Sequence, residues 1–167
     1  MKPIKCYLLS GALFAAVFGT LSHFIYEWSG RSPLAALFFP VNESTWEHMK
    51  LVFFPVLLYS LAPAPGLKAS FPSLTPALLL GTLLGTASIP VLFYTYSGII
   101  GRNYLAADIL IFLAGVLIAF RSAWLWKGSD SVYKYRSAVY LSTALLAILF
   151  FVFSFLPPGI GLFVPPE

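Results

Sequence analysis

The chain alternates long apolar segments with short polar ones, and the apolar segments have the length of membrane-spanning helices. A helix needs about 20 mainly apolar residues to cross a hydrocarbon core of about 30 Å. None of the polar segments is long enough to form a separate unit. The sequence therefore predicts an all-α fold, a single polytopic transmembrane helical bundle over residues 1–167, with five spans at about residues 6–28, 44–62, 73–96, 103–124 and 135–156.

The second span is the most informative, because its apolar part is too short to cross a bilayer. Residues 51–64 would form only about 21 Å of helix before the prolines that follow. A crossing helix must therefore begin near Ser44, where Ser44-Thr45-Trp46-Glu47 matches the capping box that starts helices. This start places Glu47 and His48 within the membrane protein, where ionisable side chains are costly and usually functional.

Other local patterns refine the predicted bundle. Residues 32–41 are apolar but too short to span, so they either lie in the membrane interface or re-enter between helices. Pro55 and Pro90 fall inside spans and predict kinks. Small residues recur at helical spacing, which predicts close packing within one bundle in preference to a dimer interface. These small residues are Gly11, Ala15 and Gly19; Gly81 and Gly85; and Gly115 and Ala119.

Composition strengthens the membrane assignment and excludes several other classes. Hydrophobic residues make up 59% of the chain and charged residues 10%, with a mean hydropathy of +0.88. These values indicate an integral membrane protein whose main partner is the lipid bilayer. The net charge of +4 comes from basic residues in loops and at helix ends, so no nucleic-acid surface is expected. The single cysteine, Cys6, excludes an internal disulfide and any multi-cysteine metal site.

The distribution of Lys and Arg predicts the orientation. A five-span arrangement places seven basic residues on one side and three on the other. The positive-inside rule then predicts a multi-pass protein of the cell membrane with a cytoplasmic N-terminus and an outer C-terminus. The first group contains Lys2, Lys5, Lys68, Arg121, Lys127, Lys134 and Arg136, and the second Arg31, Lys50 and Arg102.

Ionisable residues gather at the outer ends of the predicted spans. Four of the six acidic residues and both histidines lie there, at similar depth on three helices. Imidazole and carboxylate are ligands of catalytic zinc and of non-haem iron or manganese, so the group predicts a divalent metal site. The expected metal ligands are His23, Glu27, Glu47, His48 and Asp108, and the expected acid/base residues are Glu43 and Glu47.

Such a metal would activate water for hydrolysis of a lipid-like or peptide substrate entering from the outer leaflet, with a spare glutamate as general base. The motifs of zinc proteases and four-helix di-iron proteins, HExxH and Glu-x-x-His, are absent from the sequence. The signal therefore comes from the convergence of residue types at one boundary, and not from a known motif.

Three other interpretations use the same residues. Glu27 with Arg31 and Glu47 with Lys50 have the spacing of helix-end salt bridges, and Asp108 has Asn103, Tyr104 and Tyr94 as nearby partners. The cluster also fits a proton, cation or small-solute pathway, although its polar residues stop in the outer third of the bundle. The third interpretation is a non-catalytic membrane subunit that docks a protein partner or forms a homo-oligomer. A metal with an open coordination position favours the enzyme, and a polar cavity that reaches the inner face favours transport.

Two motifs carry a resemblance to a known family. They are His23-x2-Tyr26-Glu27-Trp28 and the segment Asn42-Glu43-Ser44-x-Trp46-Glu47-His48-x-Lys50-Leu51-x-Phe53-Phe54-Pro55. This signature resembles that of a small family of prokaryotic multi-span membrane proteins known only as a domain of unknown function. The resemblance implies a complete family member with this span layout, and it supplies no activity. The helix motifs of membrane proteases and ceramidase-like hydrolases are not matched.

Overall fold

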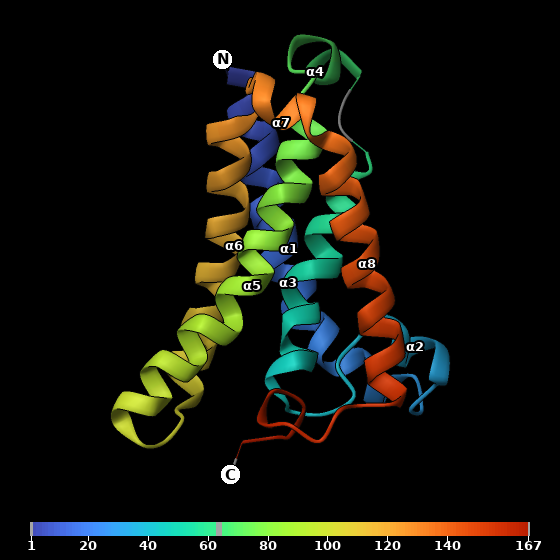
Figure 1. Ribbon diagram of the computed structural model, residues 1–167, viewed down its shortest axis with the longest axis vertical. Helices are drawn as coiled ribbons and strands as arrows, with labels where there is room; N and C mark the ends of the chain where they lie inside the picture. Colours follow the sequence, from blue (N-terminus) through green and yellow to red (C-terminus); the bar gives the residue numbers. More distant parts are fainter. Residues whose placement is uncertain (1, 63–64, 167) are drawn as a thin grey trace.

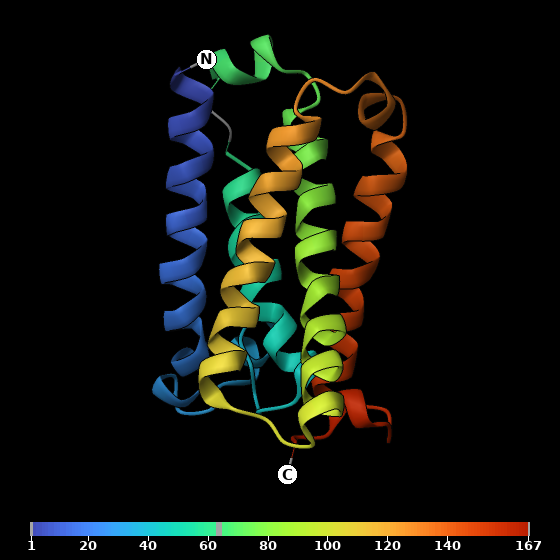
Figure 2. The ribbon, with the colours of Figure 1, turned by 90° about the vertical axis from the view of Figure 1, so that its left-hand side faces the viewer.

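The structure is a computed structural model that describes residues 2–62 and 65–166, and all regular elements in these two ranges are helical. The long helices run side by side as a bundle (Figures 1 and 2). Along the chain, the elements are α1 (Lys2–Trp28), α2 (Pro33–Phe38), α3 (Thr45–Ser60), α4 (Pro65–Ser70), α5 (Leu74–Ile100), α6 (Leu105–Trp126), α7 (Asp130–Lys134), α8 (Arg136–Phe155) and the 3₁₀ turn η1 (Gly161–Phe163).

The predicted all-α bundle is confirmed, with α3 at its centre. Helices α1, α5, α6 and α8 are long and apolar enough to cross a membrane. The remaining long helix, α3, has only 16 residues, and most of them are buried against α1, α5, α6 and α8. A helix enclosed in this way does not need the full hydrophobic length that contact with lipid would require. The number of spans is therefore four by length, with α3 as a shorter fifth helix inside the bundle.

The two ends of the bundle differ in what they carry. The N-terminus lies at the same end as α4 and α7, whereas α2, η1 and the C-terminus lie at the opposite end (Figure 1). Segment 32–41 contains the six-residue helix α2, which packs against α8 and α1 at this second end. Below, the first is called the N-terminal end and the second the C-terminal end.

Hydrogen bonds between two tyrosines join α1 to α3 near the N-terminal end. The hydroxyl of Tyr59 donates to the carbonyl oxygen of Tyr7 at 2.7 Å, and the hydroxyl of Tyr7 donates to the carbonyl oxygen of Tyr59 at 3.3 Å. The oxygen atoms Oγ of Ser10 and Oη of Tyr59 are 2.9 Å apart. These contacts fix the relative position of the two helices that carry the histidines at the other end.

Both prolines expected to disturb a helix do lie inside one, Pro55 in α3 and Pro90 in α5. Each lacks the N–H that would otherwise bond to the carbonyl four residues earlier, which permits a bend. The second half of α5 leans away from α3 together with the adjoining part of α6 (Figure 1). This leaning pair forms one wall of the site described below.

Close packing between α5 and α6 depends on glycine, as the spacing of small residues predicts. A Cβ atom at Gly81 would collide with the carbonyl oxygen of Ala119, and one at Gly85 with that of Gly115. The small residues therefore let the two backbones approach within the chain itself. The contact holds together the hairpin that carries Asp108.

Substitution of Gly85 by leucine is expected to lower the free energy of unfolding by about 1–3 kcal/mol, because the side chain would force α5 and α6 apart. Thermal unfolding in mild detergent, followed by circular dichroism, measures the loss. The matched control is Gly98→Leu in the same helix, where a Cβ atom meets nothing within 4 Å. Equal losses in the two variants would contradict the proposed role of the α5–α6 contact.

Candidate functional site: a His/Glu/His cluster beside a pocket

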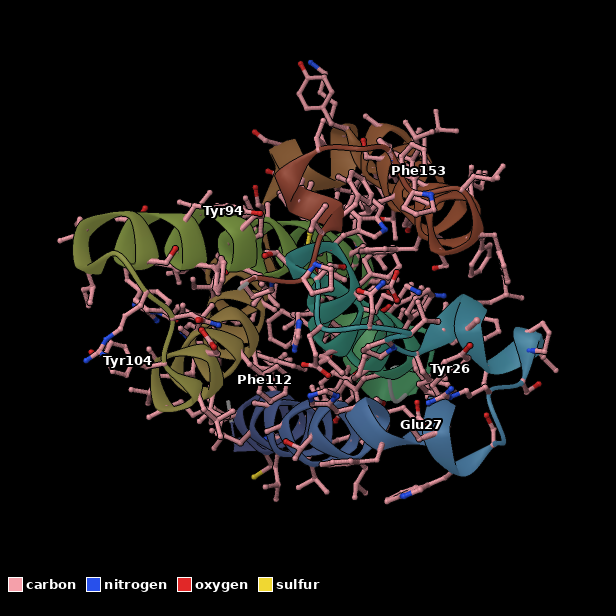
Figure 3. The ribbon with its side chains drawn as sticks, turned by 90° about the horizontal axis from the view of Figure 1, so that it is seen from below. Tyr26, Glu27, Tyr94, Tyr104, Phe112 and Phe153 are labelled. Carbon is pink, nitrogen blue, oxygen red and sulfur yellow. The ribbon has the colours of Figure 1, made fainter. Side chains whose placement is uncertain are left out.

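Three of the predicted site residues come together at the C-terminal end of the bundle. His23 lies in the last part of α1, His48 in the first turns of α3, and Glu43 in the loop before α3. One donor atom from each residue lies within 4.8 Å of the donor atoms of the other two. Figure 3, which views the bundle from this end, shows α1 and α3 as neighbours, with Phe112 of α6 on the side toward α1. We call these three residues the His/Glu/His cluster.

The start of α3 places Glu43 and His48 on the same side. The side chain of Ser44 caps the helix by accepting a hydrogen bond from the backbone N–H of Glu47 at 3.4 Å. The backbone N–H of Ser44 donates to Oδ1 of Asn42 at 2.9 Å, which tightens the preceding turn. The predicted N-cap is thus confirmed, but Asn42 takes the place that Glu47 would have in a full capping box.

The carboxylate of Glu43 lies close to both histidines of the cluster. Oε2 of Glu43 lies 3.6 Å from Nε2 of His23 and 3.4 Å from Nε2 of His48. The two imidazole rings are nearly perpendicular, with centroids 5.3 Å apart. The histidine side chains are 33% and 29% exposed and that of Glu43 is 65% exposed, so a solvent ion has access to all three.

The hydrogen bond made by His48 determines which of its nitrogens faces the cluster. Its Nδ1 lies 3.0 Å from the carbonyl oxygen of Ser44. A carbonyl oxygen only accepts, so Nδ1 must carry the proton and donate it. In the neutral imidazole, Nε2 is then left with a lone pair directed at the cluster. This arrangement is the one by which outer contacts usually orient a metal-binding histidine.

The cluster lies at one side of a pocket of about 330 Å³ formed between α1, α3, α5 and α6. The pocket is lined by the three residues of the cluster and also by Asp108 of α6. Most of the other lining residues are apolar. They are Leu51, Ile89, Phe93, Leu105, Ile111 and Phe112, with Thr45, Asn103 and Pro166 completing the wall.

Asp108 is held in this wall by a residue that the sequence analysis did not assign to it. The hydroxyl of Tyr96 donates to Oδ1 of Asp108 at 2.5 Å, and the same hydroxyl accepts the backbone N–H of Tyr104 at 3.0 Å. The expected partners were Asn103, Tyr104 and Tyr94. Tyr96 is one turn from the end of α5, so the turn between α5 and α6 brings it back over the start of α6.

Glu47 lies apart from the cluster, in a buried ion pair. Its Oε2 accepts hydrogen bonds from Nζ of Lys50 at 2.8 Å and from the backbone N–H of Val41 at 2.9 Å. Nζ of Lys50 also donates to the carbonyl oxygen of Ala36 at 2.9 Å and contacts Oγ of Ser154 in α8. The structure therefore places Glu47 in an ion pair that joins α3 to α2 and α8, and among the described residues the metal-ligand group does not include it.

Glu27 also has a partner of its own. Its carboxylate lies 3.1 Å from Nε of Arg31, and both side chains are exposed. The salt bridges that the spacing indicated at Glu27–Arg31 and Glu47–Lys50 are thus both present. Of the six residues singled out from the sequence, the His/Glu/His cluster contains three, the pocket adds Asp108, and these two pairs account for Glu27 and Glu47.

The fold and the cluster together define a helical protein of the membrane-embedded type with a potential metal-binding group at one end. A family model described as "Family of unknown function (DUF6512)" matches residues 1–165, and the chain belongs to this family. The match confirms the resemblance to a family of unknown function. Comparisons with curated proteins and with solved structures found no match.

Proposed function

We propose that this protein is a metal-dependent hydrolase that acts on a membrane-associated substrate. His23, Glu43 and His48 would bind one divalent ion, for which zinc is the metal that fits these ligands best. The observation that carries the proposal is the convergence of three ligand atoms within 4.8 Å beside a mainly apolar pocket. Two histidines and one glutamate form an established ligand set of catalytic zinc, which keeps a fourth position open for water.

Two of the three separations between ligand atoms in the cluster match those around a tetrahedral ion. Zinc–ligand bonds of about 2.0–2.2 Å place neighbouring ligand atoms of a tetrahedron about 3.3–3.6 Å apart. The two nitrogen–oxygen separations of 3.4 and 3.6 Å fall in this range. The ion would also compensate the charge of Glu43 and accept the lone pair that the Ser44 hydrogen bond leaves on Nε2 of His48.

The pocket supports a reaction at an ester or amide bond of an amphiphile. Bound zinc lowers the pKa of its water, and Asp108 is the carboxylate of the same pocket that remains to accept the proton. The resulting hydroxide would add to the carbonyl carbon, and the proton would pass to the leaving oxygen or nitrogen as the bond breaks. The apolar walls fit the hydrocarbon part of the substrate. Asp108 thus replaces the glutamate expected as general base from the sequence.

Packing beneath the pocket favours this function over transport. A Cβ atom at Gly19 would meet the carbonyl oxygen of Leu51 and the ring of Phe112, both of which line the pocket. Nearer the N-terminal end, a Cβ atom at Gly11 would meet the rings of Tyr59 and Phe120. Close contact of α1 with α3 and α6 at these two levels argues against a polar route through the bundle.

The proposed orientation follows from the basic residues. Helices and turns at the N-terminal end carry the seven basic residues Lys2, Lys5, Lys68, Arg121, Lys127, Lys134 and Arg136, whereas Arg31, Lys50 and Arg102 belong to the other end. The positive-inside rule places the first end in the cytoplasm. Under this proposal, the His/Glu/His cluster lies at the outer boundary of a cell membrane, and substrate enters from the outer leaflet.

Metal analysis of purified protein tests the site. The wild-type protein is expected to bind about one zinc ion per chain, and His48→Ala and Glu43→Gln to weaken zinc binding at least about 100-fold, because even outer contacts of metal ligands contribute about 10–100-fold. Zinc at 100 times its Kd should also stabilise the wild-type protein by about 2.7 kcal/mol, which thermal unfolding detects.

The matched control is Glu27→Gln, which removes a carboxylate at the same end of the bundle that pairs with Arg31 and supplies no ligand atom to the cluster. This variant is expected to bind zinc as the wild type does. Equal zinc binding in the wild type and in His48→Ala would show that the ligands are misassigned. A wild-type protein that binds no zinc, iron or manganese would overturn the proposed function.

A further inference from the structure

A second cavity, of about 390 Å³, lies toward the N-terminal end between α1 and α6. Leu8 and Phe120 form a buried floor, and Leu9 and Leu117 are 70% and 65% exposed on its sides. In a bilayer, such exposed leucines contact the acyl chains. The cavity is therefore an apolar groove that is open to lipid along the outside of the bundle. We call it the α1–α6 groove.

Two cations line the part of the groove nearest the helix ends. Lys5 lies in the first turns of α1 and Arg121 in the last turns of α6, and both are exposed. The apolar residues of α1 that line it, up to Ala12, follow toward the middle of the helix. The groove thus changes from cationic to apolar over about 10 Å of helix, which is the polarity of a lipid entering from a membrane surface.

The position of Trp124 indicates that the cationic part of the groove lies at the boundary between lipid headgroups and hydrocarbon. It lines the groove, and Nζ of Lys5 lies 5.7 Å from the centre of its ring. Nζ of Lys127 lies 3.8 Å from the same ring and donates to the carbonyl oxygen of Trp124 at 2.8 Å. Tryptophan is typical of this interfacial level, where one part of the ring contacts apolar groups and another contacts water.

The cations of this end lack acidic partners in the described part of the chain. All four ion pairs in residues 2–62 and 65–166 involve residues of the C-terminal end. Asp130 is the one acidic residue in the helices and turns described at the N-terminal end, against seven basic residues. Lys5 and Arg121 are therefore available to an external anion.

We propose that the α1–α6 groove binds an anionic phospholipid of the surrounding bilayer. The phosphate of the headgroup contacts Lys5 and Arg121, and one acyl chain lies along Leu9, Ala12 and Leu117. Basic pockets between transmembrane helices favour anionic headgroups through charge, and the apolar groove supplies the contact with the chain. The site is separate from the His/Glu/His cluster and needs no metal.

Native mass spectrometry of the full-length protein in mild detergent tests the site. The protein is offered equal amounts of dioleoyl-phosphatidylglycerol and dioleoyl-phosphatidylcholine, which share their acyl chains and differ in charge. The wild-type protein is expected to retain phosphatidylglycerol. The Lys5→Gln, Arg121→Gln double variant is expected to lose this preference roughly thirtyfold, because each cation at a membrane surface contributes roughly a factor of five.

The matched control is the double variant Lys68→Gln, Lys134→Gln, which removes two exposed charges of the same end that do not line the groove. It is expected to keep the preference. An equal loss of the preference for phosphatidylglycerol in both double variants would show that it depends only on the net positive charge of this end, which would overturn the proposal. A wild-type protein without preference would overturn it too.

A measurement on the wild-type protein locates the lipid without relying on a variant's stability. Phosphatidylglycerol with brominated acyl chains quenches tryptophan fluorescence on contact, so it should quench Trp124 more than brominated phosphatidylcholine does. The contribution of Trp124 is the difference between the wild type and Trp124→Phe. Equal quenching of Trp124 by the two lipids would show that the anionic lipid is not in the groove.

Discussion

Substitution of Lys50 by alanine is expected to destabilise the folded protein by about 3–5 kcal/mol, because it breaks a buried ion pair and leaves one charge without its partner. Lys50 is fully buried, and its ammonium group contacts Glu47, Ser154 and the carbonyl oxygens of Ala36 and Phe39. Removal of the ammonium leaves the carboxylate of Glu47 buried without a counter-charge. Unfolding in mild detergent, followed by circular dichroism, measures the loss.

Two controls separate the buried charge from other effects. The Arg31→Ala variant breaks the exposed pair with Glu27 and is expected to cost less than about 1 kcal/mol. The double variant Lys50→Met, Glu47→Leu removes both buried charges and is expected to recover part of the loss, because no unpaired carboxylate remains. Recovery is partial, since Val41 and Ala36 lose hydrogen-bond partners. A Lys50→Ala protein as stable as the wild type would contradict the assignment of this pair.

The second large effect is expected in catalysis. Asp108→Asn should lower kcat by about 10²–10⁴-fold, the usual contribution of a general base, while zinc content stays unchanged. Asparagine has nearly the same shape and can still accept the hydrogen bond from Tyr96, but it does not take up a proton. The probes are a fluorogenic phospholipid ester, a fluorogenic ceramide amide and a fluorogenic membrane-anchored peptide, each offered to the zinc-loaded protein.

Three outcomes of this experiment have distinct meanings. Loss of turnover with retained zinc supports Asp108 as the base. Full turnover in Asp108→Asn would contradict that role, but it would not contradict the proposal that the protein is a hydrolase. If the zinc-loaded wild-type protein cleaves none of the three probes, the proposed reaction on these ester and amide classes is wrong, and metal binding is then a separate property. The Tyr96→Phe variant, which retains the carboxylate, is expected to lose less activity than Asp108→Asn.

The helices were largely predictable because hydrophobic length and local helix signals determine them. The start of α3 at Thr45 follows from its Ser44 cap. The third span was predicted to end at about residue 96, and the helix that contains it, α5, continues to Ile100. It ends at Gly101, whose φ of 82° suits glycine, so this stop signal was present in the sequence.

The site was predictable only as a group of residue types at one boundary. Glu43 and Glu47 are four positions apart and would share a face of one continuous helix. Because α3 begins only at Thr45, Glu43 lies in the loop and meets the histidines, whereas Glu47 turns toward Lys50. The contact of Lys50 with Ser154, 104 positions away, and the hydrogen bond from Tyr96 to Asp108 both depend on tertiary packing. Local sequence patterns do not encode such contacts.

The two halves of the pocket come from different parts of the chain. Residues 23–48 supply the whole His/Glu/His cluster on α1, α3 and their connecting loop, whereas the leaning pair α5 and α6 supplies Asp108 and much of the apolar wall. A change in the tilt of that pair would alter the distance from the cluster to Asp108 without moving any of the three cluster residues. Under the proposed function, ion retention and access of substrate would therefore depend on different parts of the chain, so substitution could alter one and preserve the other.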